Sequence, residues 1–368
     1  MTKNEIIIDG SEGEGGGQVL RTSLSLSAIT GKPVRIENVR GRRKKPGLFR
    51  QHLTAFKAAA EICGATMEGA ELGSSEIAFH PGKIKGGDYE FSIGSAGATN
   101  LVAQTILPIL SNADTASNVK ITGGTHNQWA PTFDFLDQAF LPQYRKMGGR
   151  ASAELDAYGF YPAGGGAIRM AVKPTKETRA LSLEDRGERT GESVVAIVAN
   201  LGAGIANREL KTLLKALNLK PEQGEIIHAE GPGPGNAVTL FLKHENITEV
   251  FIGLGEHGVR AETVAKKIAA QAQKYLPAKD GSGQIKTAVG EHLADQLLLP
   301  MALFGGGVFT TTDISQHTRT NIDIIKRFLD VDIRMTQLGR KCWKVEVCLL
   351  YTSPSPRDQR GSRMPSSA

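Results

Sequence analysis

Residues 13–31 have the sequence GEGGGQVLRTSLSLSAITG, a glycine-rich loop followed by an apolar run with the length of a helix. The same layout recurs in GSAGATNLVAQTILPIL from Gly94 and in VGEHLADQLLLPMALFGGG from Val289. Internal repetition of this kind indicates that one supersecondary unit is used several times. The second and third copies lie much further apart than the first two, which indicates an insertion between them.

Strand-like segments lie beside these loops. They are EIIIDG (5–10), PVRIENV (33–39), YEFSIG (89–94), NVKITGG (118–124) and AIRMAVKP (167–174). Runs rich in β-branched residues and bounded by glycine or proline are typical of strands. We therefore predict an α/β fold of layered α+β type, in which three repeated βαβ-type units form a large domain.

The stretch between the second and third copies has a pattern of its own. Strands are expected at 193–201, 225–231, 237–244 and 249–254, and helices at 206–219 and 261–276. Such a segment has enough elements to fold around its own core. We predict that residues 184–280 form a smaller inserted α/β domain, and that residues 1–183 and 281–347 form the large domain.

The end of the chain differs in composition from the rest. After a strand-like segment, the sequence becomes rich in serine, proline and arginine, and CLLYTSPSPRD and SRMPSSA resemble the translation of a sequencing-library adapter. We interpret residues 348–368 as a non-native tail and exclude them from the analysis of the fold.

The overall composition fits a globular protein, since 40% of the 368 residues are hydrophobic, 22% are charged, and the formal charge is +6. Cys63 and Cys342 are isolated, which argues against a disulfide framework or a structural zinc site. No apolar stretch approaches the roughly 20 residues that a membrane helix needs. We expect a cytoplasmic protein without membrane contact, or a nuclear one if the source is eukaryotic. The sequence does not indicate an oligomeric state.

The first glycine loop contains two glutamates, Glu12 and Glu14, at a place where the N–H groups of a helix N-terminus favour an anion. A carboxylate is compatible with a bound phosphate when both share Mg²⁺. Asp295 occupies a similar place in the third copy and is a second candidate metal ligand. The alternative is that Glu12 and Glu14 are exposed turn residues.

A cluster of positive charge follows in VRGRRKKPGLFRQHLTAFKAA (39–59), which includes Arg40, Arg43 and Arg50. Such a cluster is often only a solvated surface. Here it leads through Pro46 and Gly47 into an amphipathic helix, so a scaffold fixes its position, and it is a candidate contact for nucleic-acid phosphates. Aromatic residues make up 6% of the chain, so few bases are expected to be recognised by stacking.

Two further motifs are weak when taken alone. Gly253, Gly255 and Gly258 have dinucleotide-binding spacing, but the helix after them leads to a polar loop, so a plain strand-to-helix turn explains them. His317 lies in a polar stretch before a helix expected from Thr320, and a lone histidine of this kind is usually a surface or capping residue.

Several long motifs together resemble the RNA 3′-terminal phosphate cyclases. They are GEGGGQVLR, GRRKKPGLFRQH, EICGATMEGAELGS, IGSAGATNLVAQTILP, GFYPAGGG, GEHLADQLLLPMA and QHTRTNI. The resemblance runs from about Glu5 to Val347. It implies three repeated units with a smaller inserted domain, and it implies an enzyme that uses ATP to convert an RNA 3′-phosphate into a 2′,3′-cyclic phosphate, with release of pyrophosphate and AMP.

The resemblance also implies roles for individual residues. His317 matches the histidine that becomes covalently linked to AMP, with Arg21 and Glu14 as its catalytic neighbours. Glu14 would contact the metal, Mg²⁺ or Mn²⁺. The residues expected to bind ATP are Gln18, Gln104, His292, Leu293, Ala294, Asp295 and Gln296. Some members of the family have tyrosine where this chain has His292. The imidazole of His292 is a smaller ring for adenine stacking than the phenol of tyrosine.

Two other classes remain as alternatives. A cyclase-like branch that acts in ribosome assembly resembles the same fold without catalysis, but it departs at the histidine that His317 matches. The enolpyruvyl transferases also repeat βαβ units around anionic substrates, but they lack these motifs and this insert. Retention of label from α-labelled ATP would separate the cyclase from both.

Overall fold

The structure is a computed structural model that describes residues 5–350. The described residues form four-stranded sheets, three of which have the same topology. In each of these three, the first two strands are parallel and flank a helix, and the remaining strands add in antiparallel fashion. The same strand, helix, strand, helix, strand, strand order therefore occurs three times, as the repeated glycine loops predict.

The first unit contains β1 (Ile6–Asp9), α1 (Gly17–Thr30), β2 (Val34–Glu37), α2 (Arg50–Cys63), β3 (Thr66–Glu68) and β4 (Ile77–His80). The second contains β5 (Asp88–Ser92), α3 (Thr99–Leu110), β6 (Ser117–Gly123), α4 (Phe133–Phe135), the π-helix η1 (Leu136–Phe140), α5 (Leu141–Lys146), β7 (Arg150–Ala157) and β8 (Gly166–Lys173). The third contains β9 (Leu181–Leu183), α8 (Glu291–Phe304), β14 (Gly307–Thr311), α9 (Gln316–Phe328), β15 (Val331–Gly339) and β16 (Cys342–Leu349).

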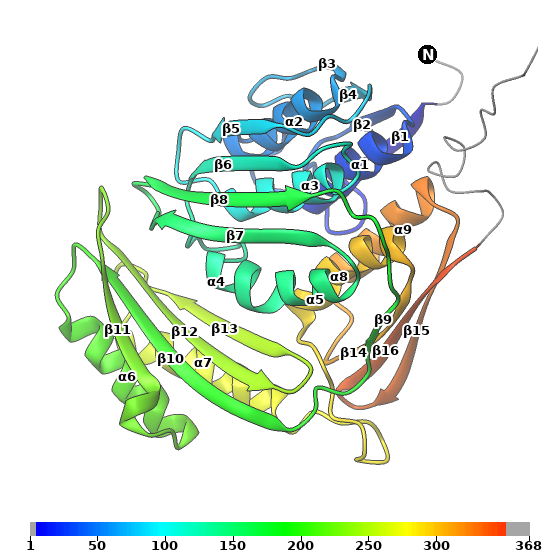
Figure 1. Cartoon of the computed structure of the whole chain (residues 1–368). Helices are drawn as coiled ribbons and strands as arrows, with labels where there is room; N and C mark the ends of the chain where they lie inside the picture. Colours follow the sequence, from blue (N-terminus) through cyan, green and yellow to red (C-terminus); the bar gives the residue numbers. More distant parts are fainter. Residues whose placement is uncertain (1–4, 351–368) are drawn as a thin grey trace, which may run out of the picture.

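The inserted unit lies between β9 and α8 in the chain and below the second sheet in Figure 1. It contains β10 (Arg189–Ala199), α6 (Gly204–Leu217), the 3₁₀ turn η2 (Pro221–Gln223), β11 (Gly224–Ala229), β12 (Gly235–His244), β13 (Thr248–Leu254) and α7 (Ala261–Tyr275). Its strands are ordered β11-β10-β12-β13, and its helices pack on one side around a separate hydrophobic cluster. Gly253 lies within β13, and Gly255 and Gly258 lie in the turn after it. Because β13 is an edge strand that pairs in antiparallel fashion with β12, these glycines form no dinucleotide-binding βαβ unit.

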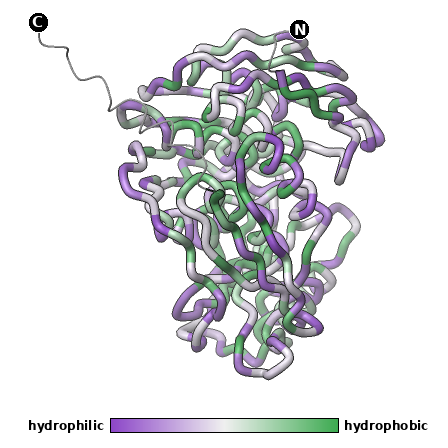
Figure 2. The backbone as a smooth tube through the Cα atoms, turned by 90° about the vertical axis from the view of Figure 1, so that its right-hand side faces the viewer, coloured by the Kyte–Doolittle hydropathy of each residue, from purple (hydrophilic) through white to green (hydrophobic). Residues whose placement is uncertain are grey.

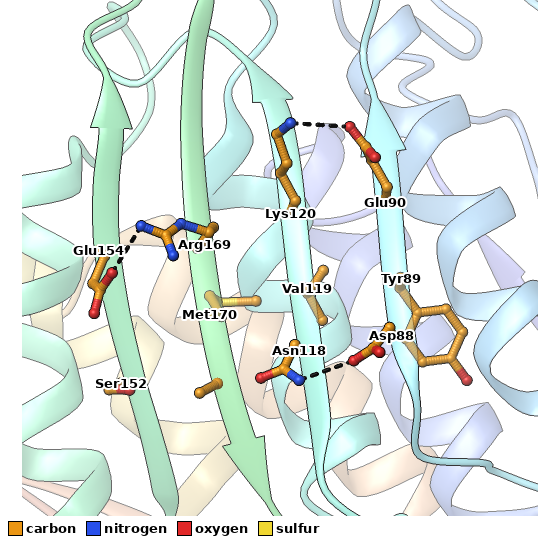
Figure 3. Close-up of a pocket in the computed structure, with 11 residues that line it drawn as sticks. Asp88, Tyr89, Glu90, Asn118, Val119, Lys120, Ser152, Glu154, Arg169 and Met170 are labelled. Atoms are coloured by element: carbon orange, nitrogen blue, oxygen red, sulfur yellow. Dashed lines mark hydrogen bonds and ion pairs between the residues drawn. The ribbon is translucent and has the colours of Figure 1, made fainter.

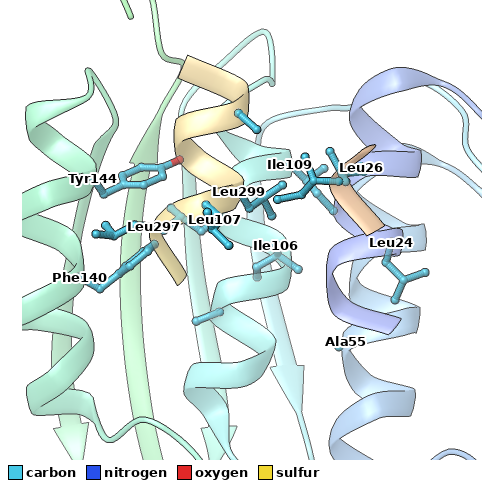
Figure 4. Packing of buried hydrophobic residues seen from close by; sticks show 14 of the residues in the cluster. Leu24, Leu26, Ala55, Ile106, Leu107, Ile109, Phe140, Tyr144, Leu297 and Leu299 are labelled. Atoms are coloured by element: carbon cyan, nitrogen blue, oxygen red, sulfur yellow. The ribbon is translucent and has the colours of Figure 1, made fainter. Parts of the chain in front are cut away.

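The main hydrophobic core lies between the sheets and the helices of the three units. Buried and less buried positions alternate along β6 and β8, so each strand buries one face and leaves the other in solvent. Figure 2 shows hydrophobic backbone segments concentrated inside the molecule and hydrophilic segments along its loops. Helices α1, α3 and α8 contribute to this core, where Figure 4 shows Leu26 next to Ile109, Leu107 next to Leu299, and Leu297 next to Phe140.

The predicted fold class is confirmed, and two details of the sequence analysis need correction. Helix α9 begins at Gln316 and not at Thr320, because the side chain of Ser315 caps it by accepting the Thr318 N–H. Strand β16 continues to Leu349, since Cys348 pairs with Asp332 and Leu349 with Val331. Two residues assigned to the tail thus belong to a sheet, and residues 351–368 of that assignment lie outside the described residues.

Candidate active site

The first glycine loop joins β1 to α1, and its conformation requires glycine at Gly13. The residue has a φ of +61°, and a β-carbon there would lie 2.2 Å from the Oγ1 atom of Thr320. The backbone N–H of Glu14 donates a hydrogen bond of 2.9 Å to the same hydroxyl. The loop is therefore fixed against α9, although the two segments lie at opposite ends of the sequence.

Glu14 is the centre of this loop, and its side chain is only 5% exposed. One carboxylate oxygen accepts the N–H of Gln18 at 3.1 Å, at the N-terminus of α1. The other oxygen forms an ion pair with Arg43 and lies 3.5 Å from Nδ1 of His317. Glu12, by contrast, is 62% exposed and pairs with Arg327. The alternative that both glutamates are exposed turn residues is therefore correct for Glu12 and wrong for Glu14.

His317 is the second residue of α9, and its side chain is half-exposed beside Glu14. Burial lowers the pKa of His317, the Glu14 carboxylate opposes this shift, and Arg21 and Arg43 add to it. The ring is thus held mainly neutral near pH 7. If Nδ1 carries the proton and faces the carboxylate, the lone pair on Nε2 is available for attack on an electrophile.

A polar wall is formed by α1, α3 and α8. Arg21 donates a hydrogen bond of 2.7 Å to Oε1 of Gln18, and its positive charge lowers the pKa of Asp295. Burial has the larger effect on Asp295 and raises its pKa to about 7, assisted by the charges of Glu14 and Glu291. Gln104 donates a hydrogen bond to Gln296, which joins α3 to α8.

The segment from His292 to Gln296 does not present all its side chains to this wall. His292 is exposed at the start of α8, and Gln296 lies one turn further, on the same side of the helix. Leu293 and Ala294 are both 0% exposed and belong to the hydrophobic core. The helical period therefore turns the side chains of these two predicted ATP-binding residues inward, away from the wall.

The basic loop between β2 and α2 places its arginines differently. Arg43 reaches Glu14. Arg40 donates hydrogen bonds to the carbonyls of Lys45 and Gly47 at 3.0 and 2.8 Å, and lies over the ring of Phe49. Arg50 is exposed at the first turn of α2. The structure therefore brings Arg43 to the site, leaves Arg50 available at the surface, and uses Arg40 to hold the loop.

Three residues that shape the site were missed in the sequence. Asn321 is 1% exposed; it accepts the hydroxyl proton of Thr22 and donates to the carbonyl of Asp295, both at 2.7 Å. Thr320 holds the first glycine loop. His52 accepts the N–H of Phe49 at 3.2 Å, and burial lowers its pKa to about 3, so it acts as a neutral cap of α2. Thr320 and Asn321 were quoted in a motif, but spacing gives no sign of partners some 300 residues away.

Within the described residues there is no group of three or more His, Cys, Asp or Glu side chains that could hold a metal ion. Mg²⁺ is usually held by one or two carboxylates together with phosphate oxygens of a bound nucleotide. Glu14, with its buried carboxylate at a helix N-terminus, and Asp295 fit that kind of shared site, whereas a site built from protein ligands alone does not fit.

A separate concavity of about 620 Å³ lies on the outer face of the second sheet. Figure 3 shows that its charged side chains pair with one another, as in Lys120 with Glu90 at 3.3 Å and Arg169 with Glu154 at 3.0 Å. Its lining, within the described chain, contains none of the predicted site residues. We therefore place the candidate active site at Glu14 and His317 and not in this concavity.

The site contains a neutral histidine next to a buried carboxylate, together with arginines and two helix N-termini. This combination is typical of proteins that carry out phosphoryl chemistry. A family model described as RNA 3′-terminal phosphate cyclase matches residues 12–335. The chain belongs to the RNA 3′-terminal phosphate cyclase family, as its motifs predict.

Curated relatives with this description extend over nearly the whole chain. The protein from Koribacter versatilis is 48% identical over 97% of this chain and 97% of its own length. Those from Pseudomonas fluorescens and Ralstonia nicotianae are 48% and 51% identical, over 94% and 89% of this chain and 98% and 92% of their own lengths. A solved structure, the enolpyruvyl transferase NikO from Streptomyces tendae, aligns with 10% identity and a TM-score of 0.36 over 93% of this chain and 48% of that chain, a likeness that supports no inference.

No helix in the described part of the chain is both long and apolar enough to cross a membrane.

Proposed function

We propose that the protein converts the 3′-terminal phosphate of RNA into a 2′,3′-cyclic phosphate, with ATP as the second substrate and with His317 as the nucleophile. The single observation that carries the assignment of the nucleophile is the position of His317, 3.5 Å from the buried carboxylate of Glu14 at the mouth of the first glycine loop. Family membership supports the overall reaction.

In the first step, Nε2 of His317 attacks the α-phosphorus of ATP. A nitrogen–phosphorus bond forms, the bond to the β-phosphate oxygen breaks, and pyrophosphate leaves. The lowered pKa of His317 keeps the ring in its nucleophilic form. Glu14 orients the ring through Nδ1, and Arg21 and Arg43 oppose the negative charge that gathers on the phosphates.

In the second step, an oxygen of the RNA 3′-phosphate attacks the phosphorus of the adenylate. The bond to His317 breaks, and a phosphoanhydride between the RNA and AMP forms. The neighbouring 2′-hydroxyl then attacks the RNA phosphorus, loses its proton and expels AMP. This last step is intramolecular, so proximity alone lowers its barrier substantially.

The polar wall is the proposed binding surface for ATP, through Gln18, Gln104, His292, Gln296 and the side chain of Asp295. Glu14 and Asp295 would hold Mg²⁺ or Mn²⁺, which would neutralise charge on the triphosphate. Because Asp295 has a raised pKa in the metal-free protein, a bound cation would also favour its ionised form.

The RNA end is assigned to Arg43 and Arg50. Arg43 lies next to the reacting groups through its ion pair with Glu14, and this pair would open when phosphate arrives. Arg50 is exposed and suits a phosphate further along the strand. Arg40, which we also expected to contact phosphate, has its guanidinium engaged by two carbonyls, so its contribution is to present the other two.

The reaction is tested with a 5′-labelled oligoribonucleotide that ends in a 3′-phosphate. With ATP and Mg²⁺, we expect a product whose 3′-terminal phosphate resists phosphatase, and whose cyclic phosphate is opened by acid to a 2′- or 3′-phosphate. An oligonucleotide ending in 3′-OH is the control and should remain unchanged. RNA binding without any conversion would instead favour the non-catalytic ribosome-assembly class.

A further inference from the structure

Exposed aromatic rings are rare on this protein. Among the described residues, the exposed large aromatic side chains are Phe49 at 40%, Tyr161 at 76% and Trp129 at 97%. Trp129 also has a positive φ of 63°, in a region that bulky residues seldom occupy. A fully exposed tryptophan in a strained conformation indicates a functional constraint more often than chance.

The loop that carries Trp129 is held firmly on both sides. Before it, the side-chain amide of Asn127 donates to the carbonyl of Ala96. After it, the side-chain amide of Asn100 donates to the carbonyl of Pro131 at 2.9 Å. Asn100 and Asn127 are 1% and 9% exposed, so these bonds are largely shielded from water. The ring is therefore presented to solvent by a fixed loop.

The second glycine loop, residues 94–98, connects Trp129 to other features of the surface. Tyr161 lies in the turn closed by the hydrogen bond from the Gly164 N–H to the Phe160 carbonyl, and a β-carbon on Gly164 would lie 3.1 Å from Cα of Ala96. On the other side, a β-carbon on Gly94 would lie 3.7 Å from Nη1 of Arg50. The loop that carries Trp129, the turn that carries Tyr161 and the side chain of Arg50 thus each approach the second glycine loop.

This loop leads directly to the candidate active site. It precedes α3, in which Asn100 lies one turn before Gln104, the residue bonded to Gln296 of α8. Asn100 is the second residue of α3, and His292 is the second residue of α8. One turn further along, the hydrogen bond between Gln104 and Gln296 joins the two helices. The loop that carries Trp129 is therefore tied through Asn100 to the first turn of α3, one turn before the wall assigned to ATP.

We propose that Trp129, with Tyr161 in a turn that touches the same loop, is a stacking platform for nucleobases at the 3′ end of the RNA substrate, while Arg50, on the other side of that loop, contacts a phosphate of the same strand. Single-stranded nucleic acids are bound by this combination of aromatic faces and a cationic side chain. Adenine of ATP is the competing occupant, but His292 already offers a ring to adenine on α8. The proposal rests on the proposed function, because it assumes an RNA substrate.

The test uses the fact that the chain has two tryptophans, Trp129 and Trp343. In the full-length W343F variant, fluorescence reports on Trp129 alone. We expect quenching by an oligoribonucleotide with a 3′-phosphate, no quenching by ATP alone, and weaker quenching by an oligonucleotide with abasic sites at its last two positions. Quenching by ATP and not by RNA would assign the ring to adenine and overturn the proposal.

A second arm measures transfer from preformed enzyme–AMP to RNA 3′-phosphate under single turnover. W129A should raise the half-saturating RNA concentration about tenfold, since base stacking contributes a factor of roughly 5 to 150, and W129F should restore most of the lost affinity. The abasic RNA should bind W129A no more weakly than it binds the wild type. An equal loss with both RNAs, or a changed oligomeric state of W129A in gel filtration, would contradict base stacking.

The two arms separate this proposal from the proposed function. If the wild type forms no enzyme–AMP, the reaction is wrongly assigned, yet the fluorescence arm still reports whether Trp129 meets RNA. If enzyme–AMP forms and transfers normally in W129A, the reaction stands and the platform is refuted.

Discussion

Replacement of Asn321 by alanine tests how the three units are joined at the site. Asn321 lies on α9, accepts from Thr22 of α1 and donates to the carbonyl of Asp295 in α8. N321A leaves a buried hydroxyl and a buried carbonyl without these partners. Each such loss costs about 1–3 kcal/mol, so the two together should destabilise the variant by roughly 2–6 kcal/mol.

The assay is thermal unfolding followed by circular dichroism. At about 2 °C per kcal/mol for a chain of this size, Tm should fall by roughly 4–12 °C. N207A is the matched control, because Asn207 is exposed on α6 and only donates to the carbonyl one turn earlier; its Tm should change by less than about 1 °C. Equal Tm values for N321A and wild type would refute the role given to this hydrogen-bonded junction.

Three further predictions concern separate parts of the molecule. Burial raises the pKa of Glu209 from 4.5 to about 7, so the folded state favours the protonated carboxyl and the free energy of unfolding falls as pH rises through that range. In urea titrations, E209Q should remove roughly 3 kcal/mol of this fall between pH 4 and pH 8. Parallel pH profiles for E209Q and the wild type would contradict this prediction. E14Q should reduce the rate of adenylation at least tenfold, because the amide carries no charge, while Tm should change by less than about 3 °C, because the amide still caps α1. A folded E14Q enzyme with the wild-type rate would exclude a role of the Glu14 charge in adenylation. R50A should slow transfer of AMP to RNA and lower the salt slope of binding by about one unit, whereas K57A, an exposed change on the same helix, should alter neither.

The repeated architecture could be predicted because its determinants are local. Glycine loops, apolar runs and β-branched segments each specify their own element, and the strands expected beside the loops are found as β1, β2, β5, β6 and β8. The resemblance to the cyclase family indicated His317 as the proposed nucleophile, which chemistry alone did not distinguish from a surface histidine. The helical period of α8 was also available, and it would have separated His292 and Gln296 from the buried Leu293 and Ala294.

The rest depends on contacts between distant segments. The burial of Glu14 follows from its position between α9 and the basic loop, to which the glycine loop gives no local clue. Arg40 and Arg43 are neighbours in a charged run, but only the folded loop shows that one holds carbonyls and the other reaches the site. Low aromatic content predicted little base stacking, whereas the fold ties the segments that carry the exposed Trp129 and Tyr161 to one glycine loop.

The most direct test of the account is the site of covalent attachment of AMP. The full-length protein is incubated with ATP and Mg²⁺, digested at alkaline pH to protect a phosphoramidate, and its peptides are mapped by mass spectrometry. The account predicts one adenylyl group on His317, lost on brief acid treatment and absent from the H317A variant. Adenylation of any other residue in the wild type, or an undiminished adduct in H317A, would contradict it.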